Sequence, residues 1–184
     1  MTTIKSRHAF RRRLPNVLGR LKVGMAIVQR RCARKSESVC GDNVAANALI
    51  DTGAILALLD RNDSWHRICV EAFAQLRLPL VTSEAVLAEL FHLVGDSRQE
   101  MEAAWGFVRS GAVVVAAIEN AELPQVQALM LRYWDRPMDF AHATLVYIAK
   151  REAVSTIFTV DHADFETYRI EGRRRFRIVP ASGP

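Results

Sequence analysis

The chain has 184 residues, a length typical of one domain, and 50% of them are hydrophobic while 24% are charged. This composition supports a packed core and argues against a wholly disordered chain. No apolar run comes near the ~20 residues that span a bilayer, so we expect no membrane segment. The three cysteines, Cys32, Cys40 and Cys69, show neither a disulfide framework nor zinc-knuckle spacing, and a reducing cytoplasm is the expected compartment.

The net charge of +5 is unevenly distributed along the chain. Residues 1–47 hold eleven Lys or Arg and two acidic residues, whereas the other 137 residues hold fourteen basic and eighteen acidic ones. The apolar residues of the first segment are scattered and follow no helical or strand pattern. We therefore expect residues 1–46 to be a basic, flexible N-terminal extension and residues 47–184 to form a folded domain.

Three interpretations of this extension remain open. An Arg-rich, Ser-containing leader with few acidic residues is typical of an organelle transit peptide. The segment could equally be upstream sequence translated from an early start, with Met25 as an internal start residue. It could also be a basic arm that contacts phosphates. Nothing in the sequence separates the last two.

From residue 47 onward, short apolar stretches alternate with segments of helical periodicity. The stretches predict strands at residues 48–50, 79–82, 113–115 and 156–160, with an edge strand at 176–179. The periodicity predicts helices at residues 54–59, 65–76, 83–94, 97–109, 121–133 and 138–151. Asn62, Asp63 and Ser64 are candidate N-caps of the second helix, and Ser83 caps and Gly95 ends the third. This alternation favours an α/β domain with a mainly parallel sheet.

Acidic residues fall where such a sheet binds its ligands, which is beyond the carboxyl ends of the strands. Asp51 ends the first strand and Asp161 follows the strand at 156–160, so both are expected to face one crevice. Glu89 lies at the rim of the apolar stripe of the third helix. Asp139 begins the last long helix, with His142 on the same face one turn later. Asp164 follows three residues after Asp161.

Converging carboxylates repel one another unless they are protonated or bridged by cations. An oxygen-rich cluster suits Mg²⁺ or Mn²⁺, and the chemistry that uses such a cluster is metal-assisted attack of water on a phosphodiester. Taken singly, each acid has a structural alternative. Asp139 could complement a helix dipole, Asp161 and Asp164 could cap turns, and Glu89 could be a solvated helix residue. Asp51 is harder to explain in this way, because a buried carboxylate is costly without a partner.

Four segments in order resemble the PIN-domain ribonucleases, in particular the VapC-type toxins of bacterial toxin–antitoxin pairs. The segments are LIDTGAILALLD at 49–60, VTSEAVLAEL at 81–90, PMDFAHATLV at 137–146 and IFTVDHADF at 157–165. The resemblance covers residues 47 to about 180. It implies a three-layer α/β/α domain and an endoribonuclease that depends on Mg²⁺ or Mn²⁺ and leaves a 5′-phosphate and a 3′-hydroxyl. It also implies an RNA substrate, a frequent homodimer and a small antitoxin that obstructs the site.

The resemblance assigns catalytic and metal-binding roles to Asp51, Glu89 and Asp161, with Asp164 as a possible accessory. The family's third acid usually occupies the alanine-flanked position where this chain has His142. Asp139, one helical turn earlier, is expected to replace that acid or to hold a metal-bound water. His142 could ligate a transition metal, which would favour Mn²⁺, or its presence could weaken metal binding.

A basic run follows the last predicted helix. Arg173, Arg174, Arg175 and Arg177 surround Phe176 and could contact RNA phosphates or stack on a base. They could equally protect an edge strand from aggregation. The alternative function is therefore a catalytically silent PIN domain that acts as an RNA- or protein-binding module through this run and the extension.

Other function classes lack their motifs. Gly53 occupies the position where the haloacid dehalogenase phosphotransferases have a second aspartate, two residues after the first. The chain has no P-loop and no G-x-G-x-x-G, so the use of a nucleoside triphosphate or a dinucleotide is unsupported. It also lacks the G-x-S-x-G turn of serine hydrolases.

Overall fold

Five short parallel strands form the centre of residues 48–184, the part of the chain that the computed structural model describes. The extension expected over residues 1–46 lies outside the described residues. The strands are β1 (Leu49–Ile50), β2 (Leu80–Ser83), β3 (Val113–Ala116), β4 (Thr156–Phe158) and β5 (Arg177–Val179), in the sheet order β3-β2-β1-β4-β5. β1 is central, since Leu49 pairs with Val81 of β2 and with Ile157 of β4.

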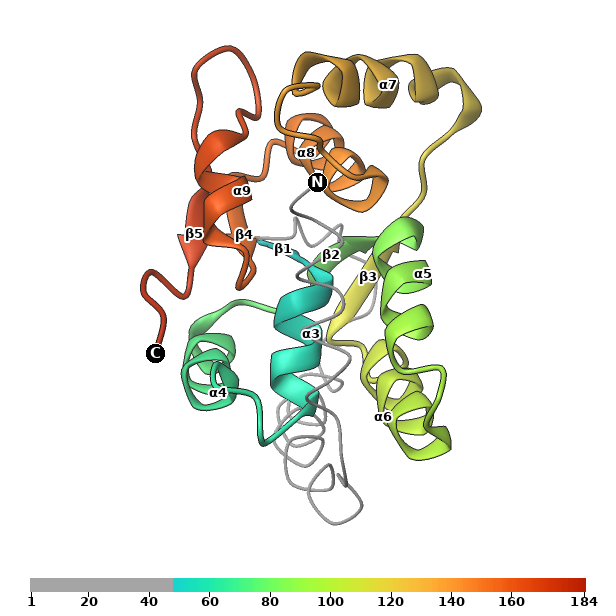
Figure 1. Cartoon of the computed structure of the whole chain (residues 1–184), viewed down its shortest axis with the longest axis vertical. Coiled ribbons are helices and arrows are strands. Elements are labelled where there is room, and N and C mark those ends of the chain that lie inside the picture. The colour runs from blue at the N-terminus through green and yellow to red at the C-terminus, as the bar shows by residue number, and fades with distance from the viewer. Residues whose placement is uncertain (1–47) are drawn as a thin grey trace, which may run out of the picture.

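Helices cover both faces of this sheet, which makes the three-layer arrangement that the sequence predicts. They are α3 (Thr52–Leu59), α4 (His66–Gln75), α5 (Glu84–Leu93), α6 (Arg98–Val108), α7 (Leu123–Arg132), α8 (Phe140–Arg151) and α9 (His162–Thr167), with a 3₁₀ turn η1 at Asn120–Glu122. In Figure 1, α3, α4 and α6 lie on one side of the strands, and α7 and α8 lie on the other. None of the helices within residues 48–184 is long and apolar enough to cross a bilayer.

Burial on both faces explains the apolar composition of the central strands. Leu49, Ile50, Ile157 and Phe158 are completely buried. α8 is also buried nearly all round, from Ala141 to Ala149, which accounts for its lack of an amphipathic pattern. The edge strand β3 differs, because Val114 and Val115 are exposed.

Several expected boundaries are wrong by one or two residues, those of α4 and β4 among them. α4 begins at His66 and its cap position is Trp65, which makes no side-chain capping bond. Instead, the carboxylate of Asp63 accepts a hydrogen bond from the Trp65 amide at 2.7 Å, an Asx turn that precedes the helix. The strand expected to reach Val160 ends at Phe158. The Thr159 amide still donates to the carbonyl of Val179, but the chain then turns, with the Asp161 amide donating to the Thr159 hydroxyl.

The expected ends of α5 are confirmed. The Ser83 hydroxyl accepts the Val86 amide at 3.2 Å, and the helix ends at Leu93, two residues before Gly95.

Gly53 allows α3 to begin beside the loop that follows β4. A Cβ atom at this position would lie 2.7 Å from Cγ2 of Val160, closer than side chains normally approach. The absence of a side chain at residue 53 therefore keeps the ends of β1 and β4 together.

Candidate active site

Asp51 lies at the carboxyl end of the central strand, at the N-cap position of α3, where its side chain makes no capping hydrogen bond. Its amide donates to the carbonyl of Phe158 at 3.0 Å, so the ladder between β1 and β4 extends to this residue. The side chain is only 3% exposed. The sheet thus places a buried carboxylate where parallel α/β sheets bind ligands.

Thr159 connects Asp51 to Asp161. Its hydroxyl donates to Oδ2 of Asp51 at 3.0 Å and accepts the amide of Asp161, also at 3.0 Å. The other carboxylate oxygen of Asp51, Oδ1, is buried and has no hydrogen-bond partner within residues 48–184. A buried carboxylate oxygen without a donor is costly, so this atom fits a cation.

His142 of α8 lies among three carboxylates. Its Nε2 is 3.7 Å from Oδ2 of Asp51, and its Nδ1 is 3.6 Å from Oδ2 of Asp139 and 3.5 Å from Oδ2 of Asp164. Burial of the imidazole opposes its protonation, but Asp164, Asp51 and Asp139 together outweigh burial and hold the pKa of His142 well above 6.5. The three carboxylates therefore favour the protonated form of His142, which partly balances their charge.

The same cation affects its acidic neighbours. Burial opposes the ionisation of Asp51, yet His142, the Thr52 amide and the Thr159 hydroxyl lower the pKa of Asp51. The contact with His142 likewise lowers the pKa of Asp164. Both carboxylates are consequently ionised in the folded protein over the neutral range.

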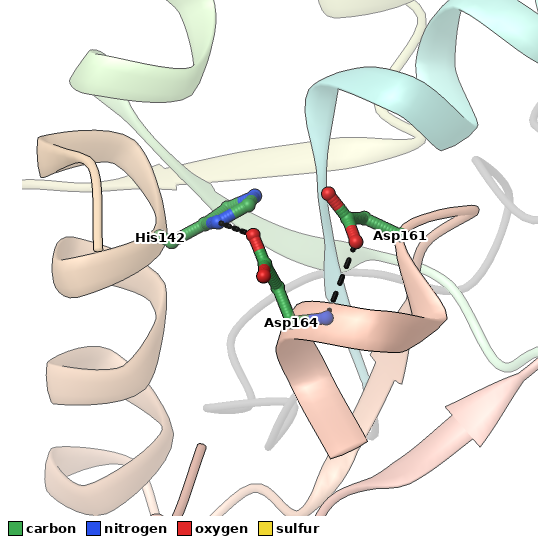
Figure 2. A group of neighbouring side chains, drawn as sticks. All are labelled: His142, Asp161 and Asp164. Carbon is green, nitrogen blue, oxygen red and sulfur yellow. Dashed lines mark hydrogen bonds and ion pairs between the residues drawn. The ribbon is translucent and has the colours of Figure 1, made fainter. Parts of the chain in front are cut away.

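Helix starts position Asp139, Asp161 and Asp164. Asp139 caps α8 and its Oδ1 accepts the His142 amide at 2.7 Å. Asp161 caps α9 and its Oδ1 accepts the Asp164 amide at 3.3 Å. One ligand atom from each of His142, Asp161 and Asp164 can lie within 4.8 Å of the others, and Figure 2 shows these three side chains pointing toward one another.

Glu89 of α5 completes the group of acids. It is half-buried, as the sequence predicts, and its Oε2 accepts the Thr52 hydroxyl at 3.0 Å. Burial, followed by the charges of Asp51 and Asp139, raises the pKa of Glu89. Burial and the charge of Asp164 raise the pKa of Asp161 in the same way. The positive charge favoured on His142 thus leaves excess negative charge around Glu89 and Asp161.

All six residues expected from the sequence to form the site come together: Asp51, Glu89, Asp139, His142, Asp161 and Asp164. The two expected as accessories, His142 and Asp164, are more central than the sequence indicates. The donor set is oxygen-rich with one imidazole, a composition that suits Mg²⁺ and Mn²⁺. The orphaned Oδ1 of Asp51 and the raised pKa of Glu89 both fit a cation that is bound by these residues.

The arginines of the basic run form no ion pair with these acids within residues 48–184. Arg173, Arg174, Arg175 and Arg177 are exposed in the turn before β5 and at its start. Phe176 is buried, with its ring centroid 5.4 Å from that of Phe165. Phe176 is therefore a core residue and is not available to stack on a base, whereas the arginines remain accessible to phosphates.

Two supporting residues were not found from the sequence. Thr52 holds Glu89, and the only sequence signal for it is its position directly after Asp51. Tyr168 lies with its hydroxyl 3.5 Å from Nδ1 of His142 and its ring edge-on to the imidazole. Nothing in the sequence marks Tyr168, because its contact with α8 depends on how α9 folds back on that helix.

The comparison with protein families agrees with this geometry. The family model of the PIN domain matches residues 48–170, from the start of β1 to the residues after α9. The chain therefore belongs to the PIN-domain family.

Individual relatives are VapC proteins. The chain is 33% identical over 135 residues to Ribonuclease VapC26 of Mycobacterium tuberculosis, a match that covers 72% of this chain and 99% of the relative. Among solved structures it is similar to VapC20 of Mycobacterium tuberculosis, which is described as a sarcin–ricin loop cleaving toxin. That match has a TM-score of 0.58 and 21% identity over 62% of this chain and 90% of the other, and it confirms the fold.

Proposed function

We propose that the chain is a metal-dependent endoribonuclease of the VapC type and the toxin of a type II toxin–antitoxin pair. The observation that carries this proposal is the orphaned, buried Oδ1 of Asp51 at the carboxyl end of the central strand, surrounded by further acids. Similarity to Ribonuclease VapC26 over almost its full length supports RNA as the substrate.

In this proposal Asp51, Glu89, Asp139 and Asp161 bind Mg²⁺ or Mn²⁺, with His142 and Asp164 as accessories. The metal supplies a Lewis acid that lowers the pKa of water and offsets the charge of the scissile phosphodiester. Thr159 and Thr52 orient Asp51 and Glu89 through their hydroxyl groups. This support keeps the carboxylate oxygens in place before substrate binds.

His142 has a specific role in this arrangement. As an imidazolium, it offsets the repulsion between Asp51 and Asp164, a role that a cation would otherwise fill. To act as a ligand it must first lose its proton, because only neutral imidazole coordinates metals. His142 and the metal are therefore expected to compete for the same carboxylates.

The remaining parts of the proposal concern organisation and partners. Residues 47–184 carry the nuclease, and residues 1–46 are a separate basic extension; the family match that begins at residue 48 supports this division. A small antitoxin obstructs the site, two copies of the chain form a homodimer, and the exposed arginines Arg173, Arg174, Arg175 and Arg177 contact RNA phosphates. The cytoplasm is the compartment in which the enzyme meets its RNA.

The decisive experiment is cleavage of a mixed pool of structured RNAs by the full chain in EDTA, Mg²⁺ or Mn²⁺. Asp51→Asn keeps the shape of the side chain and removes its charge, so cleavage should fall about 1,000-fold or more if several kcal/mol of transition-state stabilisation is lost. Asp96→Asn, the same change in the exposed turn between α5 and α6, is the control and should cut normally. Undiminished cleavage by pure Asp51→Asn would refute the site.

The silent binding module makes a different prediction. It would bind RNA or protein without cutting in any metal, and its binding would be indifferent to Asp51→Asn.

A further inference from the structure

A cavity of about 340 Å³ lies between α7, α8 and the turn at residues 170–172, and none of the six site residues lines it. Figure 1 shows α7 above α8 and the loop after α9 beside them. Its accessible apolar wall is formed by Ala128 and Leu129 of α7, which lie over the buried side chains of Val146 and Ile170. This volume is at the lower end of the range of roughly 300–1,000 Å³ that small-ligand sites occupy.

Two cations line the same cavity, Arg132 and Lys150. Both are exposed, and neither has a carboxylate partner within residues 48–184. The neighbouring Arg151, in contrast, is bound to Glu122 at 3.0 Å. One acid, Glu171, also lines the cavity, which leaves an excess of positive charge there.

Helix α8 joins the cavity to the candidate active site, since Val146 of the cavity lies one turn after His142 on that helix. The guanidinium of Arg169 is bonded to the carbonyls of Glu166, Thr167 and Tyr168 at 2.8 Å, and that of Arg136 is bonded to the Thr167 hydroxyl. Arg132, in contrast, lies with its guanidinium 5.6 Å from the centre of the Tyr133 ring. An RNA strand that runs from the acids along α8 would therefore reach Arg132 and Lys150 at the cavity.

We propose that this cavity binds one nucleotide of the substrate RNA, a short distance along the strand from the bond that is cut. The base lies against Ala128 and Leu129, the apolar lining residues that are not buried, and its phosphate contacts Lys150 and Arg132. Single-stranded RNA is commonly bound in this way, with bases in apolar pockets and the backbone on cations. The inference rests on the proposed ribonuclease function and adds a place where the enzyme selects its substrate.

Lys150 provides a direct test, since it is the one lysine between residues 48 and 184. In the full chain carrying Asp51→Asn, with Mg²⁺ and intact RNA, we expect acetylation of Lys150 to slow several-fold when RNA binds. The acetylation of Lys5, Lys22 and Lys35 is measured separately in the same experiment, because these lysines lie on other peptides. Unchanged labelling of Lys150 while RNA is bound would overturn the proposal. So would equal protection by nucleoside monophosphates at the same concentration, which would assign the cavity to a free nucleotide.

A filled cavity provides a second test. Ala128 lines the cavity but is exposed, so Ala128→Phe should occupy the space without disturbing the core. We expect RNA binding to weaken about tenfold, the value of one base–aromatic or base–pocket contact, with KM raised and kcat unchanged. Gln127→Phe, on the exposed side of the same helix, is the matched control and should behave as wild type.

Salt dependence isolates the phosphate contact. Lys150→Gln should reduce the slope of log affinity against log salt by about 0.7, the amount expected for one phosphate on a single strand. Arg109→Gln, at the end of α6, should leave the slope unchanged. If wild type cuts RNA and the cavity variants match it, the cavity proposal alone is wrong. If wild type neither binds nor cuts RNA, both the proposed function and this inference are wrong.

Discussion

Nε2 of His142 lies 3.7 Å from Oδ2 of Asp51, with both side chains buried. The chain thus has a cationic group at a position where the resemblance to PIN-domain ribonucleases leads us to expect an acid. Without a metal ion, this contact stabilises the site. The positive charge on protonated His142, however, opposes the binding of a metal ion by the same carboxylates.

His142→Asp should exchange stability for metal binding. Loss of the buried cation leaves Asp51, Asp139 and Asp164 without their partner, which is expected to cost about 3–5 kcal/mol of unfolding free energy in EDTA. Mg²⁺ should restore most of the lost unfolding free energy and raise the rate of RNA cleavage above that of wild type. Thermal unfolding with and without Mg²⁺, together with the cleavage assay, measures both. A fall in Mg²⁺-supported activity in a folded variant would show that His142 itself is needed as a ligand.

The stability of the metal-free protein should depend on pH through the same residue. The pKa of His142 is raised in the folded state above its ordinary value of 6.5. Its contribution to stability is therefore complete below pH 6.5 and is lost as the pH rises through the folded-state pKa. Denaturant unfolding in EDTA, in steps upward from pH 6.5, should show this decline. In His142→Gln the decline should vanish; a decline of equal size in that variant would assign it to another group.

Thr159→Val tests the connection between Asp51 and Asp161. Valine has nearly the same shape but can neither donate to the Asp51 carboxylate nor accept the Asp161 amide, so a buried carboxylate and a part-buried amide each lose a hydrogen bond. We expect a loss of about 1–3 kcal/mol and weaker metal binding. Thr167→Val is the control: it removes two exposed bonds, from the Arg136 guanidinium and to the Ala163 carbonyl, and should change stability by roughly 0.5 kcal/mol or less. Equal effects of the two substitutions would contradict a special role for Thr159.

Gly53→Ala tests the close approach of α3 to the loop after β4. Alanine is the better helix former by at most about 1 kcal/mol, but its Cβ would lie 2.7 Å from Cγ2 of Val160, a stiff, β-branched side chain. The steric effect should dominate and destabilise the protein by roughly 1–3 kcal/mol. Val160→Ala should recover much of this loss in the double variant, and a double-mutant cycle measures the coupling. Additive losses would mean that the two residues do not interact.

Much of the fold was predictable because it depends on local patterns. The family and the α/β class expected from the four motifs are confirmed. The convergence of Asp51 and Asp161 was predictable as well, since the carboxyl ends of β1 and β4 meet at one edge of a parallel sheet. The metal-binding roles of these residues stay predictions until the cleavage and binding experiments are done.

The parts that the sequence did not reveal depend on contacts between distant segments. Asp164 reaches His142 only because α9 folds back toward α8, and no periodicity encodes that packing. The end of β4 was misplaced for a different reason: Thr159 favours a strand by its side chain type, but its hydroxyl accepts the Asp161 amide in a turn.

The central position of β1 has a consequence for how the activity can be controlled. The amide of Asp51 is bonded across to β4, and its strand is paired on both sides, so Asp51 cannot become displaced unless the middle of the sheet opens. Amide hydrogen exchange at Asp51 is therefore expected to be among the slowest in the molecule and to follow global unfolding. Local melting would therefore leave Asp51 in place. We expect inhibition to come instead from a molecule that covers the acidic group.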